Sequence, residues 1–177
     1  MSEKIIVAGS GGQGIMLLGR ILAQTAMEEE KFVTWLPAYG AEVRGGTAHC
    51  RVIISDEEIG SPFFNKADTL IIMNQPSLVK FKDRIKKNGL MLVNSSLVDK
   101  GLIPKNAIAL PFTNVALKLG NIKVANVVAL GAYLALRKNP KIKMVKRVIQ
   151  EIAPQEKKGL IRINLKALEK GAMLKDG

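Results

Sequence analysis

Short apolar runs rich in β-branched residues alternate along this chain with longer stretches of helical periodicity. This alternation limits the possible folds more than any other feature of the sequence. Continuous apolar strands separated by helices are typical of sheets that are buried on both faces, and such sheets are mostly parallel. The sequence therefore predicts an α/β fold: a single Rossmann-like domain over residues 1–177, with a mostly parallel sheet and helices on both faces.

The pattern also predicts the individual elements. Strands are expected at residues 4–8, 32–36, 47–54, 70–73, 90–93 and 107–110. Helices are expected at residues 15–27, 76–86, 126–137, 141–152 and 165–174. Pro37 should end the second strand, and Asn164 is the expected N-cap of the last helix. Apolar and polar residues alternate in the third strand, which leaves parallel and antiparallel pairing both open.

A glycine-rich loop follows the first predicted strand. Residues 9–14 read Gly-Ser-Gly-Gly-Gln-Gly and contain a G-x-G-x-x-G string before a predicted helix. A dinucleotide site would also need an acidic residue at the end of the second strand, to hold the ribose, but that strand ends Trp35-Leu36-Pro37. NAD or FAD binding is therefore disfavoured. Two interpretations remain, a tight strand-to-helix turn or a turn that binds an anion or amide with Gln13 as a polar contact.

A second glycine-rich segment, residues 39–50, carries Glu42 and Arg44. Loops that combine charges with flexible backbone are commonly functional. Arg44 has two open roles, a salt bridge between subunits or a contact with a phosphate or carboxylate. His49 is the only histidine and is expected to be a structural or surface residue and not a catalytic base, and Cys50 is expected to be a small buried side chain. No zinc-ligand spacing is present.

Charge is distributed unevenly along the chain. Residues 1–79 hold 6 basic and 9 acidic side chains, whereas residues 80–177 hold 21 basic and 6 acidic ones. Such a field attracts anionic partners. Only 8 residues are aromatic and no nucleic-acid motif appears, so nucleic acid is a poor candidate. The most apolar tract, residues 124–136, is too short to cross a bilayer, and the N-terminus has no signal-peptide layout, so a cytoplasmic protein is expected.

Several short motifs follow one another in a specific order. They are Gly9–Ile15, Tyr39–Ala48, Ile59–Pro62, Pro111–Thr113, Val124–Asn126 with Ala129–Gly131, and Asn164–Leu165 with Glu169–Gly171. In this order, over essentially the whole chain, they make the sequence resemble the gamma subunit of the 2-oxoacid:ferredoxin oxidoreductases.

The resemblance implies a function in anaerobic metabolism within a hetero-oligomer. Such enzymes decarboxylate a 2-oxoacid on thiamine diphosphate, pass electrons through iron–sulfur clusters to ferredoxin and transfer the acyl group to coenzyme A. Thiamine diphosphate, Mg and the clusters belong to partner subunits, and the gamma subunit binds none of them. The single cysteine of this chain is consistent with the lack of a cluster, because a cluster needs about four thiolates. The form of the segment from Glu42 to Cys50 looks most like the 2-oxoglutarate enzymes.

The expected partners are therefore the other subunits, ferredoxin and coenzyme A, with no nucleic acid and no membrane. No catalytic or metal-binding residue is expected in this chain. The candidate binding residues are Gly9, Gly11, Gly12, Gln13, Gly14, Glu42, Arg44, Gly45, Gly46 and Thr47. The alternative is a stand-alone Rossmann-like dinucleotide-binding enzyme or regulator, which the missing ribose acid and the absence of an acid–base pair disfavour.

Overall fold

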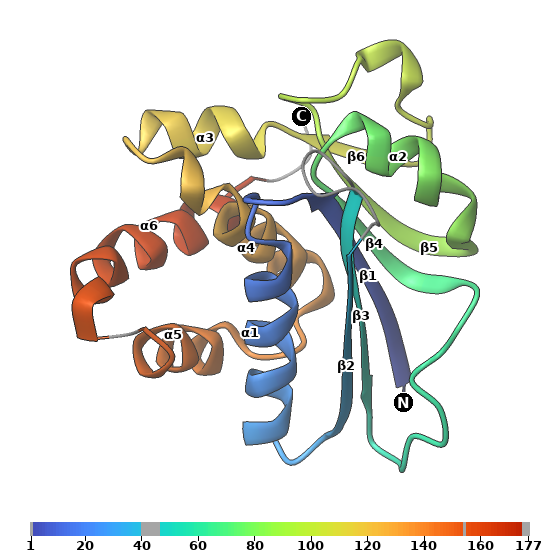
Figure 1. The fold of residues 1–177 in the computed structure, drawn as a ribbon, viewed down its shortest axis with the longest axis horizontal. Helices are drawn as coiled ribbons and strands as arrows, with labels where there is room; N and C mark the ends of the chain where they lie inside the picture. Colours follow the sequence, from blue (N-terminus) through green and yellow to red (C-terminus); the bar gives the residue numbers. More distant parts are fainter. Residues whose placement is uncertain (1, 40–46, 154, 175–177) are drawn as a thin grey trace.

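The computed structural model describes residues 2–39, 47–153 and 155–174. Six strands form one mixed sheet in the order β2-β3-β1-β4-β5-β6 (Figure 1). Their bounds are β1 Ser2–Ser10, β2 Phe32–Tyr39, β3 Thr47–Ser55, β4 Ala67–Ile72, β5 Ile85–Asn94 and β6 Ile108–Leu110. The pairs β1–β4, β4–β5 and β5–β6 are parallel, and β3 is antiparallel to both β1 and β2. The mostly parallel sheet is confirmed, and the question left open for the third strand is answered.

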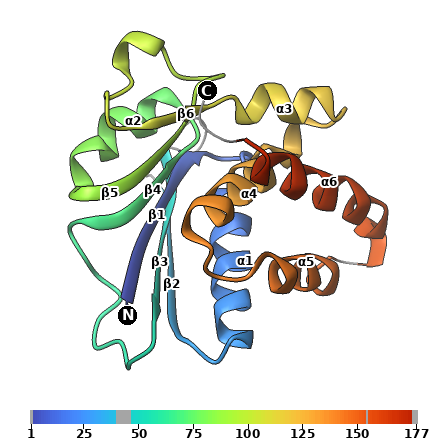
Figure 2. The same cartoon turned by 180° about the vertical axis from the view of Figure 1, so that it is seen from behind.

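Helices cover both faces of the sheet, as the apolar strands predict. They are α1 Ile15–Glu28, α2 Gln75–Phe81, α3 Phe112–Lys118, α4 Ala125–Arg137, α5 Ile142–Glu151 and α6 Ile161–Ala172. Figures 1 and 2 show α1 and α4 on one face with α5 and α6 outside them, and α2 on the other face. Consequently β1 is buried on both sides: Ile5 and Val7 belong to one hydrophobic core, and Ile6 and Ala8 belong to the other.

Several predicted boundaries were wrong. Strand β2 continues through Pro37 to Tyr39, because β2 is an edge strand and a proline there need not donate to a neighbour. Helix α2 ends at Phe81, not at residue 86, and β5 begins as early as Ile85. Helix α3, at Phe112–Lys118, was not predicted at all.

The last helix also begins earlier than predicted, at Ile161. Asn164 therefore lies inside α6, where its Nδ2 donates to the carbonyl of Leu160, so it does not cap the helix. That residues 1–177 form one functional unit stays a prediction. Within the described residues, no helix has both the length and the apolar character needed to cross a membrane.

Close packing of α4 on α6 depends on two glycines. A Cβ built on Gly131 would lie 2.1 Å from the carbonyl oxygen of Leu168, and one on Gly171 would lie 2.0 Å from the carbonyl oxygen of Val128. Both distances are shorter than any real carbon–oxygen contact, so the two backbones can approach only where side chains are missing. Both glycines belong to the ordered motifs noted in the sequence.

Candidate functional site

The glycine-rich loop lies at the carboxyl end of β1 and leads into α1. Its conformation requires glycine at two positions, Gly12 with φ +87° and Gly14 with φ +72°. Gly14 precedes the first helical residue, and the first hydrogen bond of the helix runs from Leu18 N to Gly14 O at 3.0 Å. The amides of the first turn have no carbonyl partner inside the helix. This loop therefore places hydrogen-bond donors, and the positive end of the helix dipole, at the carboxyl end of β1.

Gln13 supports this loop from inside. Its Oε1 accepts a hydrogen bond from Ser10 N at 2.8 Å, and its Nε2 donates to Met73 O at 3.3 Å. A Cβ on Gly9 would come within 2.7 Å of the same Oε1 and 2.6 Å of Ile15 Cδ1. Both polar atoms of Gln13 are thus used within the protein, and the side chain ties β1 to β4. The sequence suggested Gln13 as a polar contact for a bound anion or amide. In the structure its side chain instead holds the glycine loop in place.

Further polar side chains, which the sequence did not indicate as site residues, connect the neighbouring strands by hydrogen bonds. Asn94, fully buried at the end of β5, donates from Nδ2 to Met73 O at 3.1 Å and to Thr113 Oγ1 at 2.8 Å. Thr113 N donates back to Asn94 Oδ1 at 3.3 Å. The carboxyl ends of β4 and β5 and the start of α3 are therefore held together. The signal was present, because Asn94 directly follows an apolar strand.

Asn126, at the start of α4, contacts the loop from the helical side. Its Nδ2 donates to Gly14 O at 3.1 Å, and a Cβ on Gly14 would lie 2.4 Å from that nitrogen. Its Oδ1 is buried and has no hydrogen-bond partner among the described residues. A buried amide oxygen is costly to leave unpaired, so Asn126 retains an unused acceptor beside the loop.

Two hollows lie beside the loop. A small cleft of about 130 Å³ is lined by Gly12, Gln13, Met73, Leu97, Thr113, Ile122, Lys123 and Ala125. A larger, mainly apolar hollow of about 240 Å³ lies over α1, α4 and α6 and includes Leu17, Asn126 and Leu160 in its lining. Lys123 lines both of them. Together they offer an apolar surface next to amide donors and one cation.

The second predicted segment is only partly described. Thr47 pairs with Ser10 across the sheet, and its Oγ1 accepts a hydrogen bond from Lys80 Nζ at 2.9 Å. Tyr39 pairs with Ala48. The residues that flank the segment therefore lie at the same end of the sheet as the glycine loop, where β1 ends. Glu42, Arg44, Gly45 and Gly46 lie outside the described residues.

His49 and Cys50 point to opposite faces of β3. Cys50 is fully buried in the helical core, and burial raises the pKa of its thiol to about 12. The ring of His49 packs against that of Phe81 in a tilted arrangement, with centroids 4.8 Å apart and an interplanar angle of 51°. Partial burial, with the nearby charges of Lys80, Arg51 and Arg84, lowers the pKa of His49 to about 4. Across the described part of the chain, no group of three or more His, Cys, Asp or Glu side chains could hold a metal ion.

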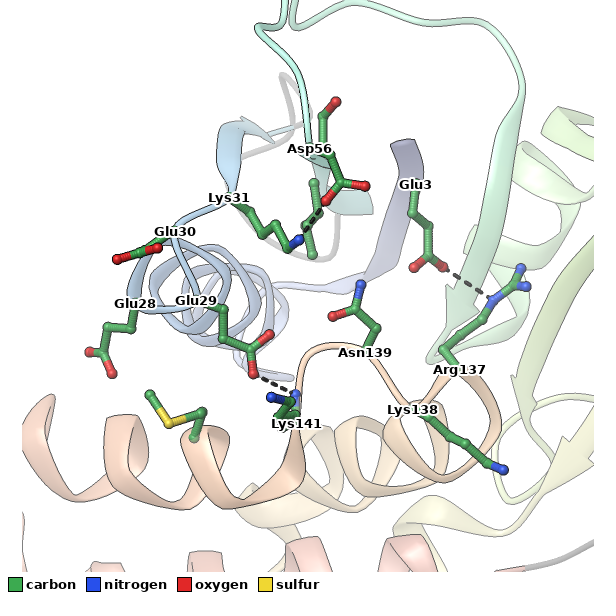
Figure 3. A pocket seen from close by; sticks show the side chains of 13 residues that line it. Glu3, Glu28, Glu29, Glu30, Lys31, Asp56, Arg137, Lys138, Asn139 and Lys141 are labelled. Atoms are coloured by element: carbon green, nitrogen blue, oxygen red, sulfur yellow. Dashed lines mark hydrogen bonds and ion pairs between the residues drawn. The ribbon is translucent and has the colours of Figure 1, made fainter. Parts of the chain in front are cut away.

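A hollow of about 770 Å³ lies at the opposite end of the sheet, at the amino end of β1 (Figure 3). Its charged side chains bond to one another: Arg137 Nε lies 3.2 Å from Glu3 Oε1, and Lys31 pairs with Asp56. The backbone N–H of Lys141 donates to Glu29 Oε1 at 2.9 Å. These bonds fix the ends of α1, α4 and β3.

Comparison with known proteins shows which family this chain resembles over nearly its whole length. Residues 4–174 match the family described as pyruvate ferredoxin/flavodoxin oxidoreductase. Subunit VorA of the ketoisovalerate oxidoreductase of Methanothermobacter thermautotrophicus is 37% identical over 169 residues, which are 96% of this chain and 35% of that protein. Subunit KorC of the 2-oxoglutarate synthase of Methanocaldococcus jannaschii is 36% identical over 176 residues, which are 97% of this chain and 92% of KorC. The chain thus spans about a third of the length of VorA but nearly all of KorC.

Solved structures have the same fold. The gamma subunit of a keto/oxoacid ferredoxin oxidoreductase from Geobacter sulfurreducens superposes with a TM-score of 0.81 at 32% identity, covering 96% of this chain and 95% of that one. A chain of the 2-oxoglutarate:ferredoxin oxidoreductase from Magnetococcus marinus gives a TM-score of 0.85 at 26% identity, covering 97% of this chain and 30% of that one. On this match over nearly its whole length, the chain belongs to the pyruvate ferredoxin/flavodoxin oxidoreductase family.

Proposed function

We propose that the chain is the gamma subunit of a multi-subunit 2-oxoacid:ferredoxin oxidoreductase. The complex oxidatively decarboxylates a 2-oxoacid to acyl-CoA and reduces ferredoxin. The observation that carries this proposal is the match to KorC, since 97% of this chain and 92% of KorC align. KorC belongs to a 2-oxoglutarate synthase, which supports 2-oxoglutarate as the substrate. The similar identity to VorA makes a branched-chain 2-oxoacid the second candidate.

The redox cofactors belong, in this proposal, to the partner subunits. Thiamine diphosphate with Mg and the iron–sulfur clusters have no evident ligands in this sequence, because one cysteine cannot supply the thiolates of a cluster. That cysteine, Cys50, is moreover buried with a raised thiol pKa. The complex is placed in the cytoplasm, with ferredoxin as its electron acceptor.

Coenzyme A is proposed to approach the glycine-rich loop at Gly9, Gly11, Gly12 and Gly14. Three features support this position: the free amides of the first turn of α1, the cation of Lys123, and the surroundings of Gly11, where a Cβ would meet no atom of the described residues within 4 Å. The related enzyme from Magnetococcus was solved with 2-oxoglutarate, coenzyme A and succinyl-CoA bound, which supports a coenzyme A site in the assembled complex. Gln13 acts by holding the loop in place.

The segment with Glu42, Arg44, Gly45, Gly46 and Thr47 is proposed to complete the same site. Thr47 lies opposite Ser10 of the glycine loop, so the chain enters β3 beside that loop. An arginine guanidinium is suited to a phosphate or a carboxylate because its donors form a planar fork.

Reconstitution tests the proposal. The tagged chain is mixed with the other oxidoreductase subunits of its source organism, and acyl-CoA formation and ferredoxin reduction are measured with 2-oxoglutarate and with branched-chain 2-oxoacids. Activity is expected only in the assembled complex and highest with 2-oxoglutarate. A chain that binds none of these subunits, or that binds NAD tightly by itself, would instead fit the stand-alone dinucleotide-binding alternative.

A further inference from the structure

One face of β3 carries positive charge that the proposed coenzyme A site does not use. Alternation turns Thr47, His49 and Arg51 away from the helical core and toward the α2 side, where Lys4 of β1 also lies. Lys80 of α2 and Arg84, just after it, approach the same face. We call Lys4, Arg51, Lys80 and Arg84 the cationic strip.

Two phenylalanine rings bring these four cations close together. Lys4 Nζ and Arg51 Cζ lie 6.0 and 5.6 Å from the ring centroid of Phe64. Lys80 Nζ and Arg84 Cζ lie 5.7 and 5.9 Å from that of Phe81. Each ring attracts its cations electrostatically, but two like charges on one ring also repel each other. A surface built in this way is most stable when an anion covers it.

Among the described residues, no such anion is paired with the strip. None of the ion pairs found within residues 2–39, 47–153 and 155–174 includes any of its four cations. Two polar atoms beside the strip, Arg51 Nε and His49 Nδ1, are buried and have no hydrogen-bond partner in the part of the chain that the structure describes. Burial and the neighbouring Arg84 also lower the pKa of Arg51, as expected where positive charges gather without compensation.

The form of the strip indicates the kind of anion. Thr47, which contacts Lys80, and Arg51 are four residues apart on one strand, a distance of about 13 Å. One phosphate group cannot meet cations spread over this length, whereas carboxylates along a polypeptide can. Two apolar side chains are well exposed nearby in sequence: Phe63, which precedes the ring residue Phe64, at 66%, and Val79, which precedes Lys80, at 61%. Arginine and aromatic residues beside charge are typical of protein interfaces.

We propose that the cationic strip is the docking surface for a carboxylate-rich segment of a partner subunit. This inference rests on the proposed function, which requires such subunits. The relatives support it, because this chain matches only 35% of VorA and 30% of the Magnetococcus chain, so in both proteins the same fold is continuous with further polypeptide.

Zero-length cross-linking of the assembled complex tests the position of the strip. A carbodiimide joins a lysine amine to a carboxylate only when the two are in contact. We expect Lys4 and Lys80 to be cross-linked to aspartate or glutamate residues of a partner subunit. The proposal is overturned if both lysines stay unlinked in the complex while lysines on the opposite face, such as Lys143, are linked to the partner.

A charge-reversal pair tests the contribution of the strip to assembly. Lys80→Glu with Arg84→Glu changes two exposed cations and should leave the fold intact. Lys118→Glu with Lys143→Glu is the matched control, since it makes the same charge change at exposed positions of α3 and α5. We expect the strip variant to bind the partner subunits at least about tenfold more weakly, and the control to bind like the wild type. Thermal melts of both variants check that they fold.

The outcomes separate this inference from the proposed function. If the wild-type chain does not assemble with the subunits, both proposals fail. If the wild type and the strip variant assemble with equal affinity, only the docking surface is wrong. A strip variant that assembles normally but no longer binds coenzyme A would also overturn the docking surface and would make the strip a phosphate site.

Discussion

At the scale of single residues, the site is held by amide side chains that bond to the backbone of other elements. Gln13 and Asn94 both donate to the carbonyl of Met73, so one backbone oxygen at the end of β4 joins the glycine loop to β5. The sequence identified the glycines and Gln13 because the string follows a strand. Asn94, Thr113 and Asn126 were missed as site residues because their roles depend on contacts between distant parts of the chain.

Replacing Gln13 should loosen the loop. Gln13→Ala removes the bond to Ser10 N and the bond to Met73 O, and we expect a loss of about 1–2 kcal/mol in the free energy of unfolding. Coenzyme A binding to the assembled complex should weaken as well. Denaturant titration and calorimetry measure the two effects. Unchanged stability would show that these hydrogen bonds do not hold the loop.

His49 should make stability depend on pH. Its pKa is about 4 in the folded protein against 6.5 ordinarily, because burial and the positive charges of Lys80, Arg51 and Arg84 disfavour protonation. Between these two values the unfolded chain binds the proton and the folded chain does not. The contribution of His49 to the free energy of unfolding is therefore fully present above pH 6.5 and is lost as the pH falls toward 4.

The variant His49→Gln isolates this effect from the carboxyl groups that titrate in the same range. Relative to this variant, the wild type should lose free energy of unfolding as the pH is lowered from 6.5 to 4. The measurement is urea unfolding at a series of pH values. Parallel curves for the two proteins would mean that the environment of His49 does not differ between the folded and unfolded states.

At the scale of elements, local pattern predicted most strands and helices but misjudged several ends. The apolar runs at residues 4–8 and 70–73 lie in strands buried on both faces, where pattern and environment agree. Pro37 misled the prediction because its consequence depends on whether the strand lies at the edge of the sheet. Asn164 likewise has a typical N-cap side chain, but the 3₁₀ turn at Gln155–Leu160 leads into α6 before that residue.

The contact between α4 and α6 should fail when a methyl group is added. Gly171→Ala would place its Cβ 2.0 Å from the carbonyl oxygen of Val128, so the helices must separate. We expect a loss of about 1–3 kcal/mol in the free energy of unfolding. Gly159→Ala is the matched control, because a Cβ there meets nothing within 4 Å, and it should change stability by less than about 0.5 kcal/mol. Equal effects of the two substitutions would contradict the close approach.

At the scale of the whole molecule, the fold class could be predicted because apolar strands alternate with helices, and the family because short motifs occur in a fixed order along the chain. The surface was less accessible. Counting charges located the positive excess in residues 80–177, yet the cationic strip combines Lys4 and Arg51 from the first half with Lys80 and Arg84 from the second. Only the pairing of β1 with β3, and the packing of α2 beside them, brings these residues to one face.

The molecule as a whole should prefer an acidic protein to nucleic acid. Both would be attracted by its net charge of +12, and both would bind more weakly as salt rises, so salt dependence alone does not distinguish them.

At about 0.15 M salt, exposed charges are screened beyond about 8 Å. Binding must then depend on contacts that fit closely. The cationic strip offers four cations held over two buried phenylalanine rings, whereas the sequence contains no motif that reads bases. We expect titrations at this salt to show much tighter binding to the partner subunits than to duplex DNA or single-stranded RNA. Sub-micromolar binding to nucleic acid at this salt, without affinity for the subunits, would exclude both the docking surface and the proposed role in the complex.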